Sequence, residues 1–354
     1  KLPNGISGLS RKIEEMGLKF GLWVELEMVN KNSDCYRAHP DWLIGAPDRF
    51  ESHSRHQHVL DFSRSEVVDF IYDSISKVIE ESSISYIKWD MNRDLVQAGS
   101  NNGQAGVHQQ VLATYRLIEQ LHREFPHVEI ESCASGGARA DLGILRYTNR
   151  VWTSDCNDPY ERQSIQRGFS YFFPAEIMGS HFGPAQAHTT NRLSTLEYRI
   201  LTNFFGHLGF EQNLLELNDV ECQQLTYYLT LYKQYRSLIH SERLVRIDTI
   251  DSGQNVYGVV NTEQTQALFA IAQNDFPCNI IANKLRISYL NTDATYKVKL
   301  LNAQENTGYL MKKSVPLCAG ELVMSGKVIA EIGIQLPIMH PQSILLMLIE
   351  QVKD

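Results

Sequence analysis

From Lys1 to about Arg246 the sequence alternates between segments with helical periodicity and short apolar segments typical of strands. The clearest example is a predicted helix at 66–80, which Ser65 would cap, followed by a predicted strand at 84–89. Strands that alternate with helices of this length usually pair in parallel within one sheet. This alternation limits the possible folds more than any other feature and predicts an α/β fold.

The other predicted elements continue the alternation. Helices are predicted at 7–16, 107–125, 162–173, 196–205 and 220–241, and strands at 19–29, 128–132, 150–154 and 175–180. The strand count of about five or six is below the eight that close a (β/α)8 TIM-type barrel. Because the chain opens on Lys1 in the middle of this pattern, we expect the missing strands to precede it, so that the barrel is N-terminally truncated.

The pattern changes after Arg246 to short alternating runs separated by Asn, Gly and Pro. These runs are 256–260, 267–272, 296–301 and 344–349. They predict an antiparallel β-sandwich domain. Since single cores stop growing near roughly 250 to 300 residues, we predict two domains, a barrel at 1–246 and a β domain at 247–354.

Composition excludes several classes of protein. A formal net charge of -8 makes nucleic acid an unexpected partner. We predict no membrane segment, because no apolar run reaches the roughly 18 residues that a span requires, and the N-terminus does not resemble a signal peptide. The six cysteines contain no CxxC pair, which argues against a disulfide scaffold and a zinc knuckle. The compartment stays open, with a cytoplasmic, reducing one favoured.

Three polar residues end the strand at 84–89. Lys88, Asp90 and Asn92 alternate with apolar residues, so their side chains share one face. Polar groups at the carboxyl end of a barrel strand suit a pocket for a hydroxylated or charged ligand. A solvated salt bridge at a strand exit explains the same pattern about equally well.

A second carboxylate is expected at the end of the strand at 150–154. Asp158 precedes Pro159 and Glu161, which is the pattern of a helix N-cap with a capping box, so its role is explained by structure. Asp155 has no such explanation and is the better partner for Asp90.

Two carboxylates on different strand ends are the minimum for glycoside hydrolysis, in which one attacks the anomeric carbon and the other protonates the leaving oxygen. We expect Lys88 to keep Asp90 ionised, and Asp155 to need a drier or more anionic setting that keeps it protonated.

Several motifs in chain order resemble glycoside hydrolase family 36, the retaining α-galactosidases. They are the runs at 21–29, 39–42, 55–61, 131–137 and 152–155, and the resemblance covers most of residues 1–245. It implies that Asp90 is the nucleophile and Asp155 the acid/base. It also implies a pocket for a terminal galactose shaped by Trp23, Arg55, Lys88, Asn92, Cys133 and Gly136.

The resemblance further implies a substrate of the melibiose or raffinose type, no cofactor, no metal and a homo-oligomer, a tetramer by analogy. In the family an Asp-Asp pair on an earlier strand and an N-terminal β domain also contact the sugar, and this chain begins after both. We therefore expect the 354-residue chain alone to be inactive or very weakly active.

Other activities fit the same residues. A galactosyltransferase resembling the raffinose synthases would use the same two aspartates. An α-N-acetylgalactosaminidase would differ in the residues that face the sugar 2-position. The alternative that is not an enzyme is a sugar-binding fragment without catalysis.

Other residues fit this chemistry less well. A metal cluster of His39, His53, His56 and His58 matches no zinc spacing. Cys133 suits a pocket wall better than a nucleophile, because no histidine is placed beside it. Glu25 and Glu27 are expected to hold basic residues.

Overall fold

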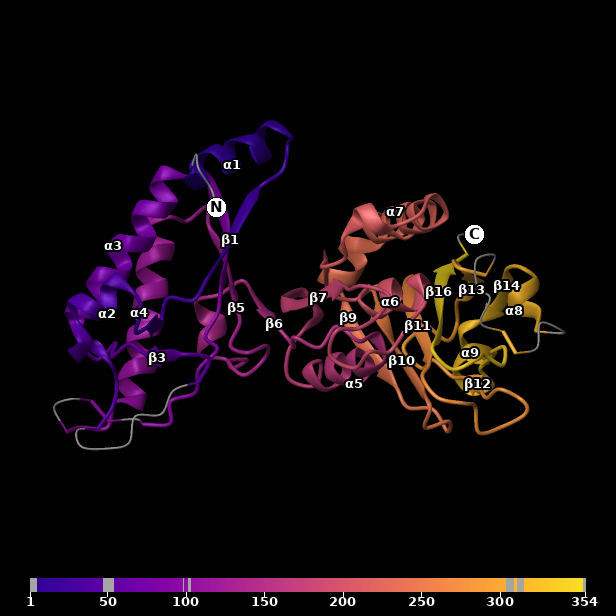
Figure 1. Cartoon of the computed structure of the whole chain (residues 1–354). Coiled ribbons are helices and arrows are strands. Elements are labelled where there is room, and N and C mark those ends of the chain that lie inside the picture. Colours follow the sequence, from indigo (N-terminus) through magenta and orange to yellow (C-terminus); the bar gives the residue numbers. More distant parts are fainter. Residues whose placement is uncertain are drawn as a thin grey trace. The chain divides into compact units, whose positions relative to one another are not determined.

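The computed structural model describes residues 5–46, 54–97, 99–100, 103–303, 309–310 and 315–352. The chain divides into two compact units, Lys1–Asp155 and Cys156–Asp354. Figure 1 shows the elements of both units along the chain.

The first unit contains helices and mostly parallel strands. In chain order its elements are α1 (Gly5–Glu15), β1 (Phe20–Val24), β2 (Met28–Asn30), α2 (Asp34–Ala38), η1 (Pro40–Trp42), β3 (Gln57–Val59), α3 (Ser65–Glu81), β4 (Ile84–Trp89), α4 (Val107–Glu124), β5 (Glu129–Ser132), η2 (Ile144–Arg146) and β6 (Arg150–Trp152). The strands β1, β4, β5 and β6 pair in parallel in that order. Their carboxyl ends therefore meet at one edge, which is where the candidate site lies.

The apolar stripes of α3 and α4 explain why these helices pack beside each other (Figure 1). Val67, Ile71 and Ile75 repeat at helical spacing on α3 and are at most 7% exposed. They share one core cluster with Leu117 of α4 and Ile87 of β4. Burying side chains of this size stabilises the fold by about 2 kcal/mol each, so the sheet that carries the site is well supported.

Two predicted boundaries in this unit were wrong. The strand predicted at 19–29 is two strands, because the chain turns after Val24 and β2 pairs antiparallel with β3. Ser65 does not cap α3 but is its first residue, and the N-cap is Arg64, which makes no side-chain capping hydrogen bond. Both errors arise from pairing and turn geometry that local periodicity does not encode.

The second unit begins with two further parallel strands and ends in an antiparallel sheet. Its elements are α5 (Pro159–Phe169), η3 (Ala175–Ile177), β7 (Met178–Phe182), α6 (Leu196–Thr202), β8 (His207–Phe210), η4 (Leu214–Glu216), α7 (Asp219–Ser241), β9 (Arg243–Ile247), β10 (Gln254–Val260), β11 (Gln266–Gln273), β12 (Lys284–Leu285), β13 (Thr295–Leu300), α8 (Pro316–Ala319), β14 (Leu322–Ser325), α9 (Gly326–Glu331), β15 (Ile334–Gln335) and β16 (Ser343–Gln351).

Three predictions in this unit need correction. Helix α5 begins at Pro159 rather than residue 162 and ends at Phe169. The strand predicted at 175–180 starts as a 3₁₀ turn and becomes β7 only at Met178. Strand β8, which pairs in parallel with β7, was missed because four residues, one of them a glycine, are too few to give a clear strand signal.

The antiparallel sheet has the order β14-β13-β16-β11-β10-β9. Its central strand β16 is buried on both faces. Ile344, Leu346 and Leu348 belong to one core cluster, while the alternate residues Leu345 and Met347 belong to another. The α/β class and the antiparallel C-terminal sheet are thus confirmed. No helix in the described part of the chain is long and apolar enough to cross a membrane.

Candidate active site

Asp90 is the central residue of the site. It directly follows β4, its backbone N–H donates to the carbonyl of Val24 at 2.9 Å, and it is 6% exposed. Its Oδ2 accepts hydrogen bonds from Trp23 Nε1 at 3.0 Å and Asn92 Nδ2 at 2.8 Å, and its Oδ1 accepts one from the N–H of Met91 at 2.8 Å. A buried carboxylate with this many donors is held in one orientation.

These donors also set the protonation state of Asp90. Burial by itself raises the pKa of the carboxyl, but hydrogen bonds from Asn92, Cys133, Trp23 and Met91 outweigh it and lower the pKa below its ordinary value. Asp90 is therefore a carboxylate at neutral pH, as a nucleophile must be.

The source of that effect differs from the sequence prediction. Lys88 forms its ion pair with the buried Glu131, at 3.2 Å, and its Nζ lies 4.2 Å from the centre of the Trp152 ring. The donors named above, and not an ion pair with Lys88, hold Asp90 ionised. Glu131, which also accepts from Tyr86 Oη at 2.5 Å, was not predicted as part of this arrangement.

Cys133 lies beside Asp90 at the end of β5. It is 2% exposed, and its backbone N–H donates to the carbonyl of Trp89 at 2.8 Å. Burial, followed by the hydrogen bond to Asp90 and the carboxylate charge, raises the pKa of the thiol to about 12. Because the thiol stays protonated, it acts as a donor to Asp90 and not as a nucleophile.

Asn92 uses both amide hydrogens within the site. Besides the bond to Asp90, its Nδ2 donates to Glu25 Oε1 at 2.6 Å, and its Oδ1 accepts from Ser135 Oγ at 3.3 Å. The expectation that Glu25 holds a basic residue was wrong, since its partners are the amides of Asn92 and Gln57. Glu27 does hold one, Arg139, at 2.7 Å.

Asp155 follows β6 and differs from Asp90 in its surroundings. Its side chain is exposed, and its Oδ1 accepts a hydrogen bond from Trp152 Nε1 at 2.9 Å. The drier setting that was expected for the acid/base is therefore absent within the first unit. Asp90 and Asp155 follow β4 and β6, which are separated by one strand of the sheet. Since neighbouring strands lie about 5 Å apart, the ends of β4 and β6 are about 10 Å apart.

Asp158 has the structural role that was predicted. It is fully buried, caps α5 by accepting from the N–H of Tyr160 at 2.9 Å, and pairs with Arg192. The expected capping box is not formed, because Glu161 instead lies 3.3 Å from Arg192. The capping and ion pair of Asp158 leave Asp155 as the available carboxylate of this segment.

Gly136 has a backbone role. Its φ is +84°, and a Cβ there would lie 3.0 Å from Cα of Ser154 and 3.1 Å from the backbone N of Asp155. At Gly137 a Cβ would lie 2.4 Å from the carbonyl oxygen of Thr153. These glycines let the turn after β5 pack against the backbone that carries Asp155.

The remaining predicted site residues are more exposed. Trp23 is 51% exposed, so its ring offers a face while its Nε1 holds Asp90. Arg55 is exposed in the turn before β3, with a φ of +56°.

Of the four histidines considered as a metal cluster, His53 lies outside the described residues. The described residues contain no group of three His, Cys, Asp or Glu side chains that could hold a metal.

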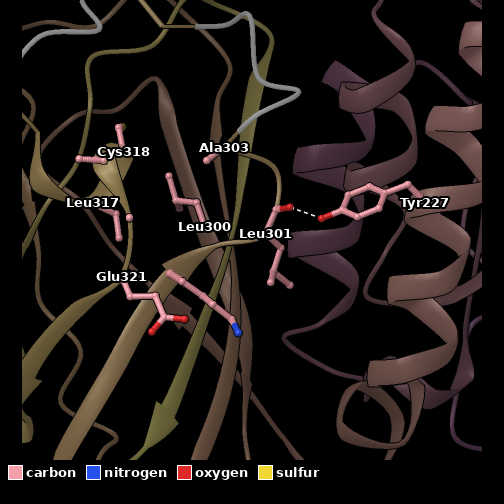
Figure 2. Close-up of a pocket in the computed structure, with 10 residues that line it drawn as sticks. Tyr227, Leu300, Leu301, Ala303, Leu317, Cys318 and Glu321 are labelled. Carbon is pink, nitrogen blue, oxygen red and sulfur yellow. Dashed lines mark hydrogen bonds between the residues drawn. The ribbon is translucent and has the colours of Figure 1, made fainter.

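A cavity in the second unit offers a contrast. Its volume is about 510 Å³, and among its described lining residues Glu321 is the single carboxylate. Figure 2 shows Tyr227 reaching from α7 to donate a hydrogen bond to the carbonyl of Leu301. The described lining of this cavity thus lacks the pair of carboxylates that follow β4 and β6.

The structure thus brings Trp23, Asp90, Asn92 and Cys133 into direct contact. Lys88 lies against Trp152, the residue that holds Asp155. An ionised carboxylate and a second acid on nearby ends of parallel strands are the groups of a glycoside hydrolase.

Comparison with known proteins agrees with that class. The family model described as Melibiase matches residues 1–242. The chain belongs to this family, the α-galactosidases of glycoside hydrolase family 36.

Individual relatives are similar along the whole chain. An α-galactosidase of Escherichia coli is 40% identical over 99% of this chain and 50% of its own length. The crystal structure of an α-galactosidase from Lactobacillus brevis has a TM-score of 0.89 and 32% identity, covering 100% of this chain and 47% of that one.

A structure of the α-galactosidase AgaA from Geobacillus stearothermophilus in complex with raffinose has a TM-score of 0.88 and 31% identity over 99% of this chain and 47% of that one. The chain therefore spans about half the length of the relatives that it matches.

Proposed function

We propose that the protein containing this chain is a retaining α-galactosidase that removes terminal α-galactosyl units from oligosaccharides of the melibiose and raffinose type. The observation that carries the proposal is Asp90, a buried carboxylate held ionised by four donors at the end of a parallel strand. Family membership and the raffinose complex of a relative support the substrate class.

In this mechanism Asp90 attacks the anomeric carbon while Asp155 gives its proton to the leaving oxygen. The bond to the leaving group breaks as the bond to Asp90 forms, which gives a β-galactosyl ester. Asp155, now a carboxylate, takes a proton from water, the water oxygen displaces Asp90, and galactose leaves in the α form. Trp23 packs the apolar face of the sugar, and Lys88, Arg55 and Asn92 contact its hydroxyls.

Gly136 and Cys133 complete the proposed pocket. Gly136 places the turn after β5 next to Asp155, and Cys133 donates to the nucleophile. The mechanism uses acid/base groups of the chain and requires no cofactor. The proposal includes a (β/α)8 barrel to which residues 1–246 contribute and a C-terminal β-sandwich at 247–354, in a protein that forms homo-oligomers.

The proposal is tested on the full-length protein with 4-nitrophenyl α-galactoside and with raffinose. Proton NMR of the first turnovers identifies the anomer released, and α-galactose is the expected product. Release of β-galactose first, or no hydrolysis of either substrate, contradicts the proposal. Transfer of galactose to an added sugar in excess of free galactose favours the raffinose-synthase alternative, because the same ester then reacts with a sugar hydroxyl.

A further inference from the structure

Glu25 lies at the site without a place in the mechanism above. It follows β1, is partly buried, and uses both of its carboxylate oxygens. Its Oε1 accepts from Asn92 Nδ2 at 2.6 Å and from the N–H of Asn92 at 3.3 Å, while Oε2 accepts from Gln57 Nε2 at 2.6 Å. Among the described salt bridges none pairs Glu25 with a cation, so its partners are amide donors.

The consequence of this arrangement is that Asn92 has one allowed orientation. Its two amide hydrogens go to Asp90 Oδ2 at 2.8 Å and Glu25 Oε1 at 2.6 Å. If the amide turned over, its oxygen would face two carboxylate oxygens, which is repulsive and leaves both without a donor. Without Glu25 the Asn92 amide would be fixed by a single carboxylate and by Ser135, at 3.3 Å.

We propose that Glu25 is a positioning residue for the reaction: it holds Asn92 so that the side-chain amide donates to Asp90. Among the donors that lower the pKa of Asp90, Asn92 has the largest effect. Glu25 therefore acts on the nucleophile through Asn92 and touches neither the reacting atoms nor the substrate. The inference rests on the proposed function.

Gln57 extends the arrangement to another segment. It begins β3 directly after the exposed turn that contains Arg55, and its side chain reaches Glu25. Glu25 thus links three segments far apart in sequence, the ends of β1 and β4 and the start of β3. Such a link fixes the position of Asn92 against two separate strands, which a bond from a neighbouring residue alone would not do.

The test is a double-mutant cycle in the full-length enzyme with 4-nitrophenyl α-galactoside. Glu25→Ala and Asn92→Ala are each expected to lower kcat/KM by about 10- to 100-fold. The double variant is expected to be no more than about threefold worse than Asn92→Ala, because Glu25 has no route to Asp90 once Asn92 is gone. Glu25→Gln, which keeps one acceptor for Asn92, is expected to lose less than Glu25→Ala.

Two controls accompany the cycle: azide distinguishes a positioning role from that of the nucleophile, and a distant variant measures the effect of losing an exposed carboxylate. Azide is expected to restore no activity to Glu25→Ala, because the nucleophile is still present. Glu80→Ala, an exposed glutamate on α3, is the matched control and is expected to stay within twofold of wild type. If Glu25→Ala does not fold, Glu25→Gln replaces it in the double-mutant cycle.

The inference is overturned if Glu25→Ala keeps full activity. It is also overturned if the losses of Glu25→Ala and Asn92→Ala multiply in the double variant. An active Asp90→Ala in the same assay overturns the proposed function instead, so the two failures are distinguishable.

Discussion

The ends of β4 and β6 carry the two proposed catalytic acids and differ sharply. At the end of β4, Asp90 is 6% exposed and accepts from Trp23, Asn92 and the backbone N–H of Met91. At the end of β6, Asp155 is exposed and accepts from Trp152. A carboxylate that must stay ionised needs donors fixed around it, whereas an acid that must carry a proton gains nothing from them. The first unit therefore fixes Asp90, the proposed nucleophile, more fully than Asp155, the proposed acid/base.

The largest expected effect tests the Asp90 side of this comparison. Asp90→Ala in the full-length enzyme is expected to lower kcat/KM by about 10⁴-fold, because no covalent ester can form. Added azide should restore turnover and give β-galactosyl azide, since it attacks the face that the carboxylate no longer blocks. Steady-state kinetics and NMR of the azide product measure this, and an active variant without azide would place the nucleophile elsewhere.

Asp155→Ala should give a loss of activity that depends on the leaving group and that is smaller than the loss in Asp90→Ala when the substrate is the nitrophenyl galactoside. General acid catalysis contributes about 10²- to 10⁴-fold. The loss should be near the upper figure for raffinose and much smaller for the first step with nitrophenyl galactoside, because nitrophenolate leaves without protonation. Azide should here give α-galactosyl azide, of opposite configuration to the product from Asp90→Ala. Equal losses of kcat/KM on both substrates would contradict the assignment of Asp155 as the acid.

Adding a methyl group at Gly137 tests the packing of the turn after β5 against the segment that carries Asp155. Gly137→Ala puts a Cβ 2.4 Å from the carbonyl oxygen of Thr153, so the backbone must shift. We expect the free energy of unfolding to fall by about 1 to 3 kcal/mol, and activity to fall through displacement of Asp155.

Gly168→Ala is the matched control for this substitution. Gly168 lies in α5, and a methyl group added there would have nothing within 4 Å, so alanine should be neutral or slightly stabilising. Chemical denaturation of both variants measures the difference, and equal stabilities would contradict the packing argument.

Asn92→Ala tests the surroundings of Asp90 through the pH dependence of activity. The hydrogen bond from Asn92 favours the ionised form of Asp90 and lowers its pKa, so removing it raises that pKa. Because the nucleophile must be ionised, activity is lost as pH falls through this pKa, and the acid limb of the kcat/KM profile should move to higher pH. An acid limb that stays in place or moves to lower pH would contradict the assignment.

The smallest expected effect concerns Cys133. With a thiol pKa of about 12 it should resist iodoacetamide at pH 8 in the native enzyme, while the exposed Cys222 is alkylated. Cys133→Ser, which keeps a donor for Asp90, should stay within about threefold of wild-type activity. Mass spectrometry of the alkylated peptides is the measurement, and rapid modification of Cys133 would show that the thiol is not held protonated as proposed.

Much of the site could be predicted from local pattern. The period-two spacing of Lys88, Asp90 and Asn92 drew attention to the strand end where the structure gathers Trp23, Asn92 and Cys133 around Asp90, and Asp158 was correctly explained as a helix cap. The roles within the cluster could not be predicted in the same way. Glu25 and Glu131 were missed or misassigned because their partners, Asn92 and Lys88, lie 67 and 43 residues away in sequence.

The sequence by itself determined the α/β class, most of the alternation of helices and strands, and the strand ends that Asp90 and Asp155 follow. Those features depend on side-chain periodicity, which is a local property of the chain. Only the tertiary structure decided which groups surround Asp90 and why Gly136 and Gly137 are glycines. The protonation state of Asp90 and the close approach of the backbone at these glycines depend on atoms from segments far apart in the sequence. A local sequence pattern does not show which of these segments meet in the folded chain.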